Sequence, residues 1–401
     1  MDFSNYKNYP IEQINSETVG SNIEIFQKIL KNASNPFAGK LSSELFVEHE
    51  TQIALQKRVP WHQFYILDPA NGEVVSAFRI IYHRGNNGYT NLLVSFVHTK
   101  AEYRKRGFID YLISECIKKY ETVGSYEFSV PGSNNKDTDD FIKKHIKPSE
   151  KYFWTLYSAV QTFYARFGFV PFRDMNWLTY KAEEVSTYTI DDVKTGFRDT
   201  TVELIAFDED VVKFFADPDY ASYVNDSLND ENVRSMSLDN PTFYTCHNRD
   251  LCVAELHHKE LKNTGLRLKH SNGKESFVIV SGDLHHEELV IHKLFTNLDV
   301  ATESELLDDD LDRIQKFLHV IFDEYPFREL GFVKGYTFAV TTADLHAKDP
   351  DTQSYIIEKL QGNDWSLDTS NTKFLAMMKD YAKDGVAEGT VWLNNGFWCF
   401  G

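Results

Sequence analysis

Residues 91–121, NLLVSFVHTKAEYRKRGFIDYLISECIKKYE, contain the pattern that decides the fold of this chain. The apolar run from Leu92 to Val97 predicts a buried strand. A short basic turn follows at 103–107, and apolar residues then recur at helical spacing as far as Tyr120. A basic, glycine-containing turn between a strand and a helix N-terminus can bind a phosphorylated ligand, because free amide groups and the positive end of the helix dipole face that ligand.

Length and composition limit the class of protein. The chain has 401 residues, more than most single cores hold, so two domains are expected. Hydrophobic residues make up 42% of the chain, which is enough for globular folding. The formal net charge of −18 argues against nucleic acid as the main partner.

Further features of the sequence indicate the cellular compartment of the protein. Four cysteines in a chain of this length do not form a disulfide framework, which favours a reducing compartment. The first ten residues lack the profile of a signal peptide, and no apolar run approaches the ~20 residues that span a bilayer. We expect a cytoplasmic protein with no membrane segment, and the sequence leaves entry into the nucleus open.

Apolar periodicity extends the prediction along the first half. In order, we expect a helix at 21–30, strands at 63–67 and 74–82, the strand and helix of 91–121, a strand at 126–130, a polar excursion at 131–150, a helix at 157–167, and closing strands at 169–172 and 177–181. A polar run at 183–201 marks the boundary between two domains, 1–184 and 185–401.

The second half repeats this order coarsely. We expect strands at 276–280 and 288–294, a helix at 308–330, a strand at 335–340, helices at 354–360 and 372–382, and a buried hairpin at 390–400. The shared order suggests a degenerate duplication at the level of fold. The second half has no loop like that at 103–107: the corresponding stretch from Val300 to Asp310 lacks glycine, and its acids would repel a phosphate.

Two motifs in the first half resemble those of the GCN5-related N-acetyltransferase superfamily. The family's acetyl-CoA loop, R/Q-x-x-G-x-G/A, corresponds to Arg104-Lys105-Arg106-Gly107-Phe108-Ile109. Its Y-x-x-x-G-F sequence corresponds to 164–169, YARFGF. The whole-chain layout is similar to fungal lysine N6-acetyltransferase-like proteins. The resemblance implies an α+β fold with a mixed sheet in the first domain and a second domain of the same type without the loop.

The resemblance also implies acetyl-CoA as the co-substrate. Amide groups along 104–109 would hold its pyrophosphate, and Gly107 would let the backbone approach closely. Ile109 stands where the family has a second small residue, and its side chain either crowds the phosphate or turns into the core. Asn134 or Asn135 corresponds to the family's cofactor-contacting Asn.

Direct transfer of acetyl to an amine needs oxyanion donors, an acid and a base. The family's donors are backbone amides of the central strand, near Phe96 and Val97 here. Tyr164 occupies the position of the family's usual acid, and packing between helix and sheet is its alternative role. No Glu lies between Asn91 and Val97 to act as base, so His98 and Glu127 are the substitutes, with water chains as a further route.

Substrate residues in this fold come from the first helices. Glu48 and Glu50 lie in that region and suit an ammonium substrate, although the sequence favours the alternative that they belong to a solvated helix face. The sequence contains no C-x-x-C or H-E-x-x-H spacing, so we expect no metal.

The expected function is acetyl transfer from acetyl-CoA to a primary amine, with free lysine or a related small amine as the leading acceptor. One alternative acceptor is a protein or peptide amine, which would make a protein the substrate or partner. The other alternative is a non-catalytic binding or scaffolding protein, favoured by the missing Glu and by Ile109.

Overall fold

The structure is a computed structural model of the chain. It describes residues 6, 8–39, 41–56, 59–125, 127–128, 133–146, 151–173, 175–183, 187–196, 199–206, 230–236, 242–283, 286–331, 335–370, 374–381 and 385–393. None of the helices in this described part of the chain is both long enough and apolar enough to cross a bilayer.

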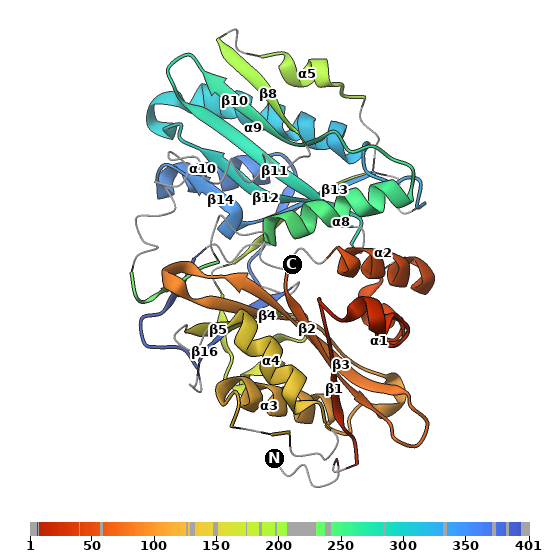
Figure 1. Cartoon of the computed structure of the whole chain (residues 1–401). Coiled ribbons are helices and arrows are strands. Elements are labelled where there is room, and N and C mark those ends of the chain that lie inside the picture. Colours follow the sequence, from red (N-terminus) through yellow and green to blue (C-terminus); the bar gives the residue numbers. More distant parts are fainter. Residues whose placement is uncertain are drawn as a thin grey trace.

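Two large sheets are stacked along the length of the molecule (Figure 1). The first has the strand order β1-β2-β3-β4-β5-β16-β6. Its strands are β1 (Ile11–Asn15), β2 (Trp61–Leu67), β3 (Val74–Arg84), β4 (Thr90–Thr99), β5 (Tyr152–Ser158), β6 (Val170–Phe172) and β16 (Leu375–Asp380). The second has the order β15-β7-β13-β12-β11-β10-β8. Its strands are β7 (Trp177–Ala182), β8 (Thr200–Ala206), β10 (Asn263–His270), β11 (Glu275–Asp283), β12 (Glu288–Thr296), β13 (Tyr336–Thr341) and β15 (Trp365–Asp368), and β14 (Leu345–Ala347) also pairs with β12.

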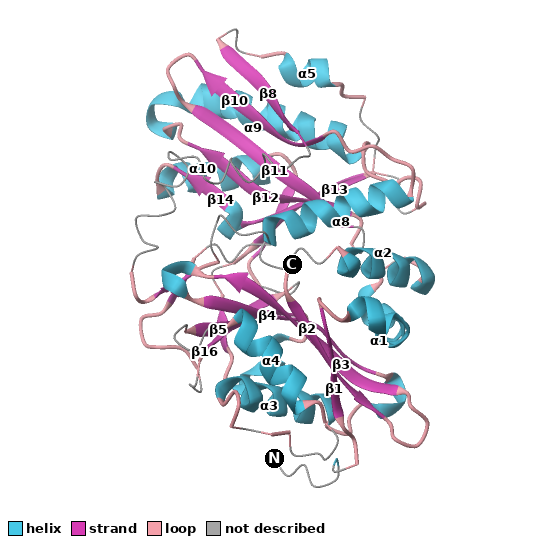
Figure 2. Ribbon diagram, in the orientation of Figure 1, coloured by secondary structure: helices cyan, strands magenta, loops and turns pink. Residues whose placement is uncertain are grey.

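Helices cover both faces of the first sheet, as Figure 2 shows. One face packs against α1 (Ile23–Phe37) and α2 (Ser43–Leu55), and the other against α3 (Phe108–Glu121) and α4 (Asn135–His145). The second sheet shares a core with α8 (Thr242–Leu256), α9 (Val300–Phe322) and α10 (Pro350–Gly362), and the short α5 (Ile190–Lys194) lies against α9. The α+β fold class predicted from the sequence is confirmed.

The two sheets have the same plan, so the predicted duplication of the fold is confirmed. In each, four antiparallel strands are followed by one parallel neighbour: β4 pairs with β5 in parallel, and β12 pairs with β13 in parallel. An antiparallel strand and an edge strand complete each sheet, and the antiparallel strand comes from the other half of the chain. β16 lies between β5 and β6, whereas β7 lies between β13 and β15.

This exchange of strands crosses the boundary expected at residue 184. Residues 177–182 follow the first sheet in sequence, yet they pair with residues 336–341 of the second half. Residues 375–380 were expected to form a helix, and that prediction is wrong, because they form a strand of the first sheet with all six residues buried. A segment buried on both faces carries a continuous apolar run, which periodicity alone does not distinguish from a helix.

The expectations between α3 and β6 also needed correction. Residues 127 and 128 are not in a strand, and the rest of the strand expected at 126–130 lies outside the described residues. The polar stretch at 131–150 contains α4 and leads into β5. Tyr157 is therefore on a strand, and only residues 161–167 form a helical segment, the 3-10 helix η5 (Gln161–Phe167). The aromatic residues of 152–157 favour a strand, but Tyr157 also matched the helical spacing of Val160, Phe163 and Phe167, so it was placed in the helix expected at 157–167.

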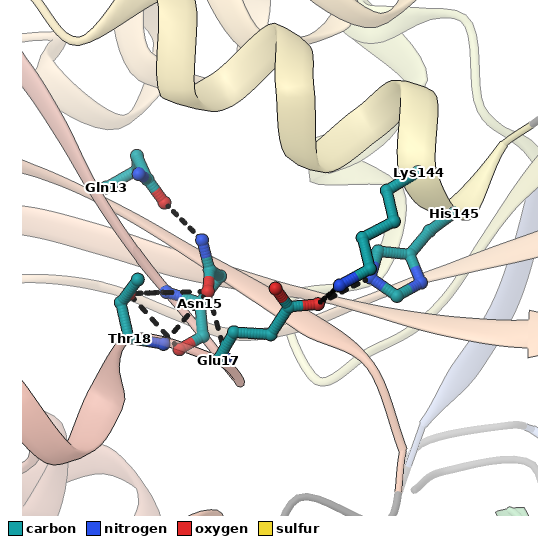
Figure 3. Close-up of polar contacts among 6 residues, drawn as sticks. All are labelled: Gln13, Asn15, Glu17, Thr18, Lys144 and His145. Atoms are coloured by element: carbon teal, nitrogen blue, oxygen red, sulfur yellow. Dashed lines mark hydrogen bonds and ion pairs between the residues drawn. The ribbon is translucent and has the colours of Figure 1, made fainter.

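Helix α4 is tied to the start of the chain (Figure 3). Glu17, after β1, accepts hydrogen bonds from Lys144 at 2.6 Å and His145 at 3.4 Å. On the other side of Glu17, Asn15 organises the turn after β1 by accepting from the backbone of Thr18. We call the first sheet with α1 to α4 the first lobe, and the second sheet with α5 and α8 to α10 the second lobe. Helix α4 is part of the first lobe, and it covers the same sheet face as α3.

Other elements agree with the expectations or extend them. The helix expected at 308–330 begins eight residues earlier, at Val300, because the Asp299 carboxylate caps it by accepting from the Ala301 amide. It ends at Phe322, so the expected extension to 330 is wrong. The short β17 (Val391–Trp392) pairs in parallel with β9 (Val233–Arg234). Of the hairpin expected at 390–400, Thr390 and Leu393 are not in a strand, and residues 394–400 lie outside the described residues.

Candidate functional site

The central strand β4 separates from its neighbour before it ends. The parallel pairing of β4 with β5 stops at Val94 opposite Leu156, while β4 continues to Thr99. On the other side of β4, its pairing with β3 shifts register between Ala77 and Arg79, because β4 has a bulge between Ser95 and His98. Phe96 lies in this bulge with a φ of 51°, a value that residues other than glycine rarely adopt. The backbone around Phe96 and Val97 is thereby freed from the regular ladder.

The strand leads into the turn that the sequence predicted. Lys105 and Gly107 have φ values of 61° and 85°, and Gly107 is the N-cap of α3. Within the described residues, the amide groups from Lys105 to Asp110 donate to no backbone or side-chain acceptor. The side chains of Arg104, Lys105 and Arg106 are exposed. Unpaired amides, three cations and a helix N-terminus together suit a pyrophosphate.

The sequence left two directions open for the Ile109 side chain, toward the phosphate or into the core, and the structure shows the second. Ile109 is half-buried and packs against the core beneath α3, so its side chain turns inward. Phe108 is buried in the same core. Arg104 donates from Nε to the carbonyl of Thr99 at 3.0 Å, and the Arg106 guanidinium lies 5.4 Å from the centroid of the Tyr103 ring.

A tyrosine from the start of the chain lies against Gly107. The Tyr6 hydroxyl donates to the carbonyl of Arg106, and the Tyr6 ring stacks on Tyr111 with centroids 5.2 Å apart. A Cβ atom added to Gly107 would lie 2.6 Å from the Tyr6 oxygen. Both the positive φ and this contact therefore require glycine at position 107.

Tyr164 lies in η5, which ends at Gly168 in the left-handed conformation. Its ring is buried among Phe163, Phe167 and Phe169, so it packs as a core residue as well. Burial raises the pKa of the Tyr164 phenol well above its usual value, which keeps the proton on the hydroxyl. Two residues on, Arg166 donates to Asp110 in the first turn of α3 at 2.8 Å, so the two sequence motifs lie together.

His98 is buried near the end of β4. Its Nδ1–H donates to the carbonyl of Phe96 at 2.9 Å, and Nε2 is buried without a hydrogen-bond partner among the described residues. Burial is the main cause that lowers the pKa of His98 to about 4; the hydrogen bond to Phe96 opposes this shift, and the positive charges of Arg79 and Arg104 add to it. His98 is therefore neutral at pH 7 and binds a proton only weakly.

Two predicted residues lie elsewhere. Glu127 is exposed and is not on a strand beside β4. Asn134 precedes α4, where its side chain donates to Asp137 at 3.0 Å and its amide bonds to the carbonyl of Ile11. The structure records no contact of Glu127 or Asn134 with the described residues of the 104–109 turn.

The two substrate candidates face in different directions. Glu48 is exposed and lines an open groove of about 590 Å³ between α1 and α2. Glu50 is buried, and its carboxylate lies 3.6 Å from Nη1 of Arg79 on β3. No sequence motif indicated Arg79. A single arginine within the apolar run at 74–82 was the feature that could have drawn attention to it.

The corresponding place in the second lobe is closed. β14 pairs with β12 at residues 294–296, beyond the point where β12 stops pairing with β13. The N-terminus of α9 is capped by its own acids: Asp299 accepts from the Ala301 amide at 3.0 Å, and Glu303 accepts from the Asp299 amide at 2.9 Å. These contacts support the expectation that the second half does not bind the cofactor.

A small group of metal-type ligands lies at the turn between β11 and β12. The ligand atoms of Asp283, His286 and Glu288 lie within 4.8 Å of one another. The His286 Nδ1–H group donates to Asp283 at 2.8 Å, so a hydrogen bond already accounts for the contact between these two residues. The neighbouring His285 lies outside the described residues.

The chain is similar to solved structures described as GCN5-related N-acetyltransferases. A tandem protein of this kind from the clavulanic acid biosynthesis pathway has a TM-score of 0.45 and 11% identity, with 94% of this chain and 99% of that chain covered. One from Sphaerobacter thermophilus has a TM-score of 0.45 and 10% identity, covering 96% of this chain and 98% of that chain. A probable N-acyltransferase from Enterococcus faecalis V583 has a TM-score of 0.46 and 11% identity, covering 93% of this chain and 73% of that chain.

The sequence matches no protein-family model and no curated protein.

Proposed function

We propose that this protein is an N-acetyltransferase that transfers the acetyl group of acetyl-CoA to a primary amine. The observation that carries the proposal is the turn from Arg104 to Ile109, where unpaired amides and exposed cations meet the N-terminus of α3. Such a turn suits the pyrophosphate of coenzyme A.

The neighbouring groups support transfer within one complex of enzyme, acetyl-CoA and amine. A neutral amine attacks the thioester carbon, and negative charge develops on the carbonyl oxygen. Backbone amides near Phe96 and Val97, beyond the last β4–β5 pair, are the proposed donors to that oxygen. As the C–S bond breaks, the thiolate takes a proton from the Tyr164 hydroxyl, which its raised pKa keeps protonated until then. The nitrogen, positively charged after its attack, loses a proton to water as the amide forms, and the Tyr164 phenolate takes a proton back from water.

The proposed acceptor is free lysine or a related small amine, as the whole-chain resemblance implies. A peptide amine is the alternative acceptor, and a panel of amines separates the two. We expect thiol release from acetyl-CoA with free lysine and none with lysine-containing peptides whose termini are blocked. Release with the peptides alone would replace the small-amine proposal by the peptide one, and no release with any amine, together with no binding of acetyl-CoA, would refute acetyl transfer.

We further propose that acetyl-CoA binds only in the first of two domains, 1–184 and 185–401, with strand exchange linking them. The closed β12–β14 region and the acidic cap of α9 support this assignment.

A further inference from the structure

Phe96 has a conformation that its surroundings must hold in place. Residues other than glycine rarely adopt its φ of 51°. Phe96 also lies within a strand, where neighbouring residues are extended. A residue in such a conformation relaxes to a regular strand unless several contacts hold it. Relaxation would return the bulge to the ladder and turn its amide groups away from their present direction.

Contacts hold both the ring and the carbonyl of Phe96. The guanidinium of Arg79 lies 4.4 Å from the centroid of the Phe96 ring, and Phe37 of α1 lies 5.3 Å from it on ring centroids. The carbonyl accepts a hydrogen bond from His98 Nδ1–H at 2.9 Å. His98 follows Phe96 by two residues, so this bond closes the bulge locally.

Arg79 is itself fixed in position. Its side chain is buried, its Nε donates to Gln63 at 3.3 Å, and its Nη1 lies 3.6 Å from the Glu50 carboxylate. Arg79 is paired with Ser95, the residue before Phe96, across the β3–β4 ladder. A buried, paired guanidinium on an adjacent strand is a rigid support for the aromatic ring above it.

We propose that Arg79 and His98 are positioning residues of the acetyl-transfer site, which hold the Phe96 bulge so that its amide groups face the thioester carbonyl. This inference rests on the proposed function. It assigns His98 a role as hydrogen-bond donor to the backbone, in place of the general base considered from the sequence. It also gives Arg79, which no motif indicated, a role in catalysis that acts through Phe96.

Two substitutions of His98 separate positioning from base catalysis. His98→Asn retains an N–H group near the place of Nδ1, whereas His98→Ala removes the donor. Positioning predicts that kcat falls by about 100-fold in His98→Ala and recovers most of this loss in His98→Asn, since small displacements of reacting groups cost factors of this order. The dissociation constant of acetyl-CoA should stay unchanged in both variants, because the pyrophosphate turn is intact.

The Arg79 test removes the ion pair as a whole. Arg79→Gln alone would leave the buried Glu50 carboxylate without its partner, so the variant to measure is Arg79→Gln with Glu50→Gln. We expect kcat to fall about 10- to 100-fold with the acetyl-CoA dissociation constant unchanged. The matched control is Arg84→Gln, at the exposed end of the same strand, which should keep wild-type kcat. Thermal unfolding of each variant checks that it is folded.

The outcomes distinguish this inference from the proposed function. If His98→Asn and His98→Ala lose kcat equally while the wild type is active, His98 is not a positioning residue. If the Arg79–Glu50 double variant is folded and keeps wild-type kcat, Arg79 has no positioning role. If the wild type neither binds acetyl-CoA nor releases thiol, the proposed function itself fails.

Discussion

The Nε2 atoms of His49 and His257 lie 3.2 Å apart, although 208 residues separate them in the sequence. His49 is on α2 of the first lobe, and His257 follows α8 of the second lobe. At least one of the two rings must be neutral, since one nitrogen accepts while the other donates. Protonation of both rings would bring two positive charges into contact between the lobes.

We therefore expect acid to weaken this contact. Burial is the main cause that lowers the pKa of His257 below its usual value, although Glu48 and Glu329 oppose the shift. The unfolded chain then binds more protons than the folded one, so stability is intact above about pH 6.5 and falls as the pH drops toward the folded pKa. His257→Gln, which keeps a neutral donor and acceptor, should lose less stability between pH 7.5 and 5.5 in urea unfolding. The control is the exposed His258→Gln, and equal losses in both variants would contradict the account.

The exchange of β7 and β16 predicts that the halves do not fold alone. A fragment of residues 1–184 would lack the strand between β5 and β6 and would expose β7 without its partners. We expect each half to be insoluble or unfolded by circular dichroism when expressed alone, and the two halves co-expressed to form a folded complex. A fragment 1–184 that is monomeric and unfolds cooperatively would show that β16 is dispensable.

Gly107 should be intolerant of a side chain for two separable reasons. Gly107→Ala adds strain from the positive φ, about 1–2 kcal/mol, and a contact with the Tyr6 hydroxyl. Gly72→Ala is a matched control, because Gly72 has a φ of 69° with no atom within 4 Å of an added Cβ. We expect the Gly107 variant to be less stable in denaturant than the Gly72 variant, and Tyr6→Ala to remove the difference. A difference that persists with Tyr6→Ala would mean that Tyr6 is not the obstruction.

Removal of the Tyr164 hydroxyl should slow the chemical step. We expect Tyr164→Phe to lower kcat by about 100-fold with little effect on acetyl-CoA binding, since general acids contribute such factors. The exposed Tyr188→Phe serves as the control. Because the Tyr164 pKa is raised, its proton is retained through alkaline pH, and kcat should show no loss up to about pH 10 from this group. Full activity of Tyr164→Phe would limit Tyr164 to packing.

Local patterns predicted the elements that depend on local sequence. The strand, basic turn and helix of 91–121 are present, because a buried strand, a glycine with positive φ and an amphipathic helix each leave a short-range signal. The exchange of β7 and β16 left none, because strand partners are chosen by long-range packing. Residues 375–380 and Tyr157 were assigned to helices for the same reason: burial on both faces removes the alternation that marks a strand.

The candidate site was predictable only in part. The two family motifs located the 104–109 turn and Tyr164, and Asp110 and Arg166 bring them together. The support of the bulge was not predictable, because Arg79 acts through a cross-strand contact with no sequence spacing of its own. Glu48 and Glu50 are close in sequence, but the helix directs one to solvent and the other to Arg79.

Calorimetric titration with acetyl-CoA tests the central claim most directly. The account predicts one bound acetyl-CoA per chain, with affinity at least about tenfold weaker in Arg104→Glu combined with Arg106→Glu, because two cations beside the pyrophosphate become anions. Arg84→Glu, away from the turn, should bind as the wild type does. Absence of binding by the wild type, two sites per chain, or unchanged affinity in the double variant would contradict the assignment of the cofactor to the 104–109 turn.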